Sequence, residues 1–95
     1  MRNDNMSKKD LIVPMVHLNG TGKAGLMKQY QEMYRAVTAA ITVLCDNGPH
    51  GRDYYTYGNT AYEVARNQHQ SRIDKLNEVI QEILDIVEKL DDATS

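Results

Sequence analysis

The sequence is poor in the residues that build large cores and disulfide scaffolds. Its 95 residues include no Phe, no Trp, two Pro and one Cys, and the aromatic side chains are six Tyr. A chain this short buries only roughly 60 to 65% of the surface that its unfolded form exposes. We therefore expect a thin core and no large enclosed active site, with self-association as a source of further burial.

The sequence also has little excess of one charge over the other and no long apolar run. Eleven basic residues stand against 13 acidic ones, a net charge of −2, so the chain has no positive face for duplex nucleic acid. Residues 11–18 form a short apolar patch that Pro14 interrupts, so we expect no signal peptide. We also expect no membrane partner. The single Cys45 cannot form an internal disulfide and suits a packed, reduced thiol. These features indicate a cytoplasmic protein.

The chain divides into a tail and one helical domain. Residues 1–9 are polar and aperiodic and predict a disordered tail, so the domain covers residues 10–95. Pro14 removes a backbone donor and disfavours a helix before it, which predicts an extended N-terminal arm. Residues 19–22, Asn-Gly-Thr-Gly, supply a turn and a candidate N-cap for the first helix.

Two segments carry apolar residues at alternating spacings of three and four, the pattern of a long packed helix. Residues 46–49 end the first helix, and the Thr60–Glu63 segment matches a capping box that opens the second. The seams are Leu26, Tyr30, Met33, Val37, Ala40 and Leu44 in residues 23–45, and Ile73, Leu76, Ile80, Ile83, Val87 and Leu90 in a helix running to about residue 90. The expected fold is all-α, an antiparallel hairpin of two long helices with an extended N-terminal arm. Because a second apolar line flanks each seam, we expect this hairpin to assemble into a homo-oligomeric helical bundle.

Candidate ligand-binding residues gather around the loop between the helices. The second seam becomes polar towards the loop, where Arg66 and His69 could bind an anion and donate a hydrogen bond. The loop adds Arg52, Tyr54, Tyr55 and Tyr57, a combination that stacks nucleobases and contacts phosphate. The alternatives are that the Tyr rings plug the end of the bundle and that the Arg residues pair with carboxylates across the oligomer.

A second group, Asn19, Thr21 and Lys23, lies where the first helix begins. Free backbone donors, the helix dipole and an ammonium there suit a phosphate. Residues 17–24 end in Gly-Thr-Gly-Lys-Ala but do not match a nucleotide-binding P-loop. His17 stands where the motif has its first Gly, and Ala24 stands where it has its final Ser or Thr. This group and the loop lie at opposite ends of one hairpin, so an antiparallel neighbour would have to bring them into one inter-subunit site.

Catalytic and metal chemistry find little support in the sequence. The His residues at 17, 50 and 69 have no metal-ligand spacing, and Cys45 with His50 lacks an orienting partner. The acidic residues of the second helix, Glu78, Glu82, Asp85 and Glu88, are predicted on its solvent face. We therefore expect no enzyme, no catalytic or metal-binding residue and no cofactor.

The strings HLNGT before the first helix and HGRDYY before the second resemble a type of small phage and prophage protein, over residues 16–90. More loosely, the size and expected architecture are similar to the viral anti-CBASS sponges, which sequester cyclic oligonucleotide immune signals without cleaving them. That resemblance implies an anti-defence protein in the bacterial cytoplasm that binds a cyclic nucleotide between subunits, and it assigns no ligand residue here. The alternative is an interaction module whose helical face inhibits a bacterial defence or regulatory protein.

Overall fold

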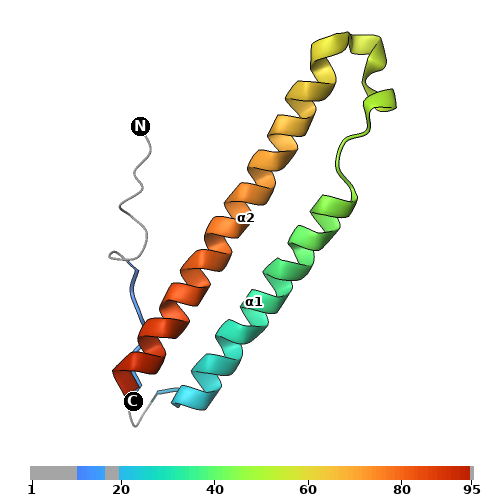
Figure 1. Ribbon diagram of the computed structural model, residues 1–95. Helices are drawn as coiled ribbons and strands as arrows, with labels where there is room; N and C mark the ends of the chain where they lie inside the picture. The colour runs from blue at the N-terminus through green and yellow to red at the C-terminus, as the bar shows by residue number, and fades with distance from the viewer. Residues whose placement is uncertain (1–10, 17–19, 95) are drawn as a thin grey trace.

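Two long helices, packed side by side as a helical hairpin, make up the protein in a computed structural model that describes residues 11–16 and 20–94 (Figure 1). Helix α1 spans Lys23–Asp46 and helix α2 spans Asn59–Thr94. Two short 3₁₀ helices, η2 (Gly51–Asp53) and η3 (Tyr55–Tyr57), lie between them. The all-helical fold class predicted from the apolar spacing is confirmed, whereas the tail predicted for residues 1–9 lies outside the described residues.

The two helices differ in length, and this difference creates the loop end of the molecule. At ~1.5 Å per residue, the 24 residues of α1 and the 36 of α2 are about 36 and 54 Å long. Lys23 at the start of α1 pairs with Asp91 near the end of α2, and Leu44 near the end of α1 contacts His69. The first turns of α2 therefore extend beyond α1. There η3 packs beside α2, and η2 packs against η3 (Figure 1).

The core between the helices is thin. Leu26 on α1 and Ile73, Ile83 and Leu90 on α2 are the buried apolar residues of the described chain. The whole chain measures 62 × 29 × 18 Å and has a radius of gyration of 18.4 Å, where a compact domain of this length has about 12 Å. The four buried apolar residues thus all lie on the two helices.

The predicted seam is right for α2 and partly wrong for α1. On α2, Leu76, Ile80 and Val87 are half-buried between the three buried residues. On α1, Met33 and Ala40 are exposed, although the seam prediction placed both in the interface. The reason is geometric, because a single neighbouring helix covers only a narrow stripe and both residues lie at its edge.

The ends of α1 lie within one residue of their predicted positions, whereas the start of α2 differs from its predicted form. Gly22 is the N-cap of α1, and no side chain caps the first turn. Helix α2 begins at Asn59, so Thr60 lies inside the first turn instead of acting as the N-cap of a capping box. At the C-terminus of α1, the Asn47 side chain donates to the Val43 carbonyl over 2.7 Å, which satisfies one of the carbonyls that a helix end leaves unpaired.

Two predictions about single side chains are wrong. Cys45 is exposed, not packed, because it lies beside the stripe that α2 covers. Asp85 is only 4% exposed, although the sequence placed it on the solvent face of α2. Gln81, one turn earlier, donates to its carboxylate over 3.4 Å.

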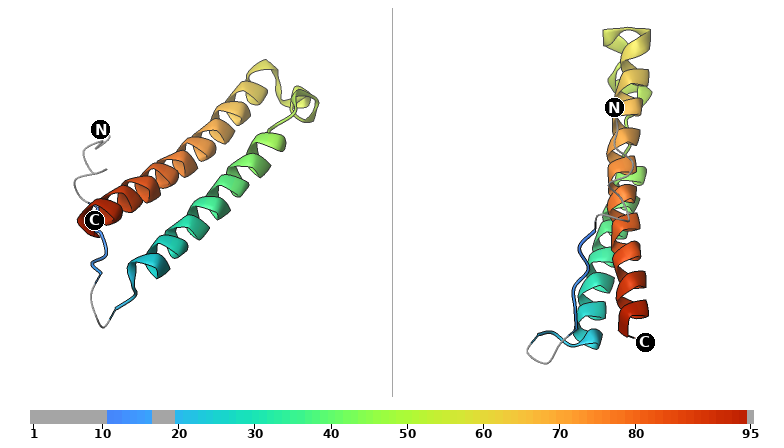
Figure 2. Two further views of the ribbon diagram at one scale, coloured as in Figure 1. Left: turned by 60° about the horizontal axis from the view of Figure 1, so that its bottom comes forward. Right: turned by 90° about the vertical axis from the view of Figure 1, so that its left-hand side faces the viewer.

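The N-terminal arm, residues 11–16, has no regular secondary structure and runs beside the C-terminal end of α2 (Figures 1 and 2). Leu11, Val13, Pro14 and Val16 are half-buried, while Ile12 and Met15 project outward. The absence of helix agrees with the effect expected of Pro14. No helix in the described part of the chain is long and apolar enough to cross a membrane.

Candidate functional site

The most organised side-chain arrangement at the loop end is a stack of Tyr54, Tyr62 and Arg66, here called the Tyr–Arg cluster. The rings of Tyr54 and Tyr62 have their centroids 6.4 Å apart at an interplanar angle of 42°, within the range of attractive aromatic pairs. The guanidinium carbon of Arg66 lies 5.5 Å from the centroid of the Tyr62 ring, a cation–π distance. The cluster thus joins the loop to the first turns of α2.

Local sequence explains this arrangement. Tyr62 and Arg66 are one turn apart on α2, and side chains at that spacing are neighbours on a helix surface. Tyr54 follows η2 and precedes η3, and its backbone N–H donates to the Gly51 carbonyl over 3.0 Å. This tight turn holds the Tyr54 ring against the helix. Gly58, with φ of 109°, then lets the chain turn into α2 in a conformation that favours glycine.

Two cationic side chains at the loop end, Arg66 of the cluster and Arg52 of the loop, remain available for a ligand. Arg66 and Arg52 are both exposed, and neither forms an ion pair within the described residues. A guanidinium that stacks on a ring by its face still presents its N–H edge, which can bind a phosphate or carboxylate through two hydrogen bonds. The chemistry at the loop end is therefore suited to holding an anion beside an aromatic surface.

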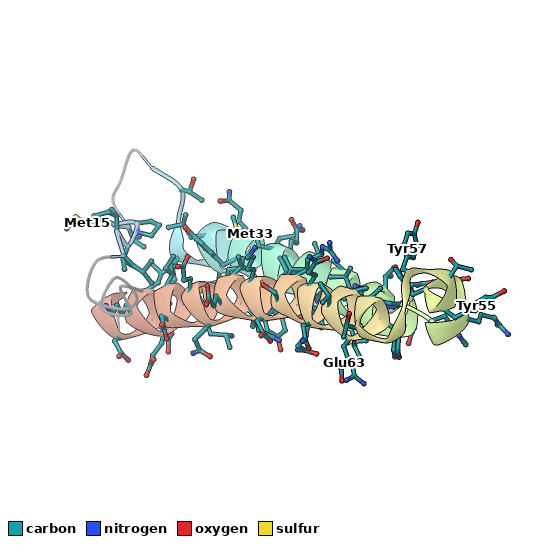
Figure 3. The ribbon with its side chains drawn as sticks, turned by 90° about the horizontal axis from the view of Figure 1, so that it is seen from above. Met15, Met33, Tyr55, Tyr57 and Glu63 are labelled. Atoms are coloured by element: carbon teal, nitrogen blue, oxygen red, sulfur yellow. The ribbon has the colours of Figure 1, made fainter. Side chains whose placement is uncertain are left out.

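Tyr55 and Tyr57 do not join the cluster. Their side chains are 76% and 77% exposed, and Figure 3 shows them projecting from the loop end in different directions. Neither ring forms an aromatic pair with another described ring. Of the four loop residues predicted to bind a ligand, the structure brings only Tyr54 into contact with α2 through its ring.

His69 has a different partner from the one predicted. Its Nε2 lies 2.6 Å from the backbone carbonyl oxygen of Leu44, and because a carbonyl only accepts, Nε2 is the donor. The ring also lies against Gly48, since a Cβ on that residue would be 3.5 Å from His69 Cδ2. His69 therefore caps the C-terminus of α1 from the neighbouring helix, where the helix dipole favours a donor.

The second predicted group lies at the other end of the hairpin. Lys23 Nζ is 2.9 Å from an Asp91 carboxylate oxygen, so this lysine in a first helical turn has a partner across the hairpin. Thr21 is exposed, and its Cγ2 atom lies close to Gly25, where an added Cβ would be only 2.8 Å away. Asn19 lies outside the described residues. Within one chain, this group and the Tyr–Arg cluster are separated by the length of α1.

The Lys23–Asp91 pair supports a prediction about stability. Because the two side chains are 35% and 61% exposed, solvent screens the pair, and we expect Lys23→Gln to lower the free energy of unfolding by no more than about 1 kcal/mol. Urea denaturation at low and high salt measures this, and the difference from the wild type should shrink as salt rises. A salt-independent loss of several kcal/mol would contradict the ion-pair role.

Tyr62, which lies beside Arg66, was not among the predicted ligand-binding residues, although the sequence contained a signal for this contact. The signal was the spacing of four between an aromatic and an arginine on a helix, which is a known stabilising pair geometry. The hydrogen bond of His69 had no comparable signal, because its acceptor is a backbone carbonyl 25 residues earlier.

Comparison of the chain with protein-family models, with curated proteins and with solved structures finds no match. The resemblance to phage proteins and to cyclic-oligonucleotide sponges therefore stays a prediction.

Proposed function

We propose that the protein is a non-enzymatic binding protein that holds a small anionic ligand at the Tyr–Arg cluster. The observation that carries this proposal is the exposed guanidinium of Arg66 stacked over Tyr62, with no ion-pair partner in the described chain. Arg52, in the loop that contributes Tyr54, is a second exposed cation at this end of the hairpin. A planar base stacking on an exposed ring and a phosphate on a guanidinium edge are the interactions that such a surface offers.

A cyclic nucleotide is the ligand class that fits both halves of this surface. It combines flat bases with phosphates that keep their charge at neutral pH. Sequestering such a signal would serve evasion of bacterial host defence. It would require affinity and no catalytic group, which agrees with the residues of the cluster. In the inter-subunit form of the proposal, Thr21 and Lys23 of a neighbouring chain complete the site beside Arg52, Tyr54 and Arg66.

Calorimetric titration with a panel of cyclic di- and trinucleotides tests the proposal. We expect one of them to bind, and we expect Arg66→Gln to weaken that binding at least about tenfold, since a charge-assisted bidentate contact is lost. Arg72→Gln is the matched control, because Arg72 is also an exposed arginine of α2 but lies outside the cluster. Binding should also weaken as salt rises.

Two outcomes would count against this function. If no nucleotide gives heat, or if Arg72→Gln weakens binding as much as Arg66→Gln does, the cluster is not an anion site. The inter-subunit form has its own test, because Lys23→Gln should weaken binding only if Lys23 reaches the ligand from a neighbour. Unchanged affinity after removal of the charges at both Lys23 and Arg66 would exclude both forms.

A second candidate function is that of a protein-interaction module that inhibits a bacterial partner through a helical face. The observation that favours it is the exposure of apolar residues on the helices, including Met33, Val43, Val79 and Leu84. Pull-down experiments from bacterial lysate separate this function from ligand binding. They compare the wild-type protein with a variant that carries a charged residue on such an apolar face. If the protein is an interaction module, the nucleotide panel gives no heat, the wild type captures a bacterial protein, and the charged variant does not.

A further inference from the structure

Helix α1 carries an apolar line along one edge of the predicted seam, which α2 does not cover. Met33, Ala36, Ala40 and Val43 follow one another at spacings of three, four and three, which places them on one edge of the helix. Met33 is 43% exposed and Val43 59% exposed, and both alanines are exposed. We call these four residues the α1 edge.

The surroundings of this edge are unusually free of charge. Between Arg35 and Asp46 the sequence AVTAAITVLC has no charged residue on any side of the helix. An amphipathic helix with one side in water normally carries charged or strongly polar residues there. The solvent side of α2 does so, with Lys75 and Glu82 among its exposed residues. The second half of α1 is thus composed like a helix with neighbours on more than one side.

The edge also has room for another helix to approach closely. Alanines at the centre of a contact let helix axes come to about 8 Å, the short end of the usual range. Figure 3 shows Met33 on the side of the hairpin opposite Glu63, together with Met15 from the arm and Tyr57 from the loop. Met15 and Tyr57 are exposed as well, so this side of the hairpin carries exposed side chains with large apolar surfaces near both of its ends.

We propose that the α1 edge packs against the α1 edge of a second copy of this chain, in a dimer with two-fold symmetry. A two-fold interface places the same patch of both subunits face to face. An uncharged patch meets its own copy without like-charge repulsion, whereas the charged side of α2 would not. Two hairpins joined in this way form a bundle of four helices, with the two α1 helices at its centre.

The chain exposes more surface than a compact protein of its mass, which leaves area for an interface with a second copy. The chain exposes 7308 Å², while a compact protein of 10.8 kDa exposes about 5,500 Å². The excess of roughly 1,800 Å² is larger than the ~800 Å² that each partner contributes to an interface of standard size. The chain thus exposes enough area for an interface of standard size, and the uncharged α1 edge is the part of that surface that suits a second copy.

Sedimentation equilibrium of the full chain tests the proposal through one substitution at the edge and a matched one elsewhere. We expect the wild type to sediment as a dimer and Val43→Glu to weaken the dimer about 100-fold or more, because a charge is buried against apolar groups. Val64→Glu is the control: Val64 is 52% exposed on α2, and its substitution should leave the dimer intact. A monomeric wild type, or equal dissociation by both substitutions, overturns the proposal.

Chemical cross-linking keeps the test decisive if Val43→Glu also reduces helicity. Ala40→Cys and Thr38→Cys are each introduced with Cys45→Ser, so that each chain holds one thiol. Position 40 lies on the α1 edge and position 38 on the opposite side of the same helix. A short bis-maleimide should join Ala40→Cys chains into covalent dimers and leave Thr38→Cys chains single. The reverse pattern, or none, overturns the assignment of this edge.

Discussion

Replacing Leu90 by Ala should cost more stability than truncating any exposed side chain of the hairpin. Leu90 is fully buried, with 0% exposure, and is one of only four buried apolar residues in the described chain. Removing a buried leucine side chain to Cβ costs about 2 to 5 kcal/mol through lost transfer free energy and the cavity left behind. Small domains have only roughly 5 to 15 kcal/mol of stability in total, so this change removes a large share.

Leu84→Ala is the matched control for that experiment. It makes the same truncation on the same helix, but Leu84 is 42% exposed, so less apolar surface returns to water and a smaller cavity forms. We expect a loss below about 1 kcal/mol. Urea denaturation followed by helix content measures both values at one protein concentration. Equal losses for Leu90→Ala and Leu84→Ala would show that the interface between the helices does not dominate stability.

The two helices could be predicted because apolar spacing and chain breakers are local features of the sequence. Residues 46–49 and the glycines around residue 20 delimit α1 within one residue of its observed ends. The capping box was a poorer guide, since α2 begins before Thr60. The end of α2 was placed too early because residues 91–94, Asp-Asp-Ala-Thr, do not extend the apolar seam.

Which apolar residues face the partner helix could be predicted for α2 but not fully for α1. On α1 almost every position of the second half is uncharged, so several lines fit the same spacing equally well. Met33 and Ala40 belong to the regular three-four pattern, yet they lie at the edge of the interface, while Ile41 is half-buried. The sequence indicated that α1 has too much apolar surface for one neighbour, and the structure shows which part of it is exposed.

The candidate site could also be predicted only in part from the sequence. Contact between Tyr62 and Arg66 follows from their spacing on one helix, which is a local property. The positions of Tyr55, Tyr57 and His69 depend on how the loop folds over the extension of α2 and on where α1 stops beside it. Those are properties of the packed hairpin, so the sequence could nominate these residues but could not assign their partners.

The second large effect that we expect is a loss of stability when His69 is replaced. Replacing His69 by Ala removes the donor to the Leu44 carbonyl, the one hydrogen bond between side chain and backbone that joins α1 and α2 in the described chain. A hydrogen bond of this kind contributes about 1 to 2 kcal/mol, and more where the acceptor loses its access to water. The Asn47 N–H also donates to this carbonyl, over 3.2 Å, so we expect a loss of about 2 kcal/mol and no more.

Two further variants separate the hydrogen bond from the presence of a histidine. His69→Gln keeps a side-chain N–H donor of similar reach and should recover part of the stability. His50→Ala removes an exposed histidine from the loop and should change the unfolding free energy by less than about 0.5 kcal/mol. The readout beyond stability is amide hydrogen exchange in the last turn of α1, which should accelerate in His69→Ala because the helix end frays. If exchange there is unchanged, His69 stabilises the hairpin by packing alone and does not cap α1.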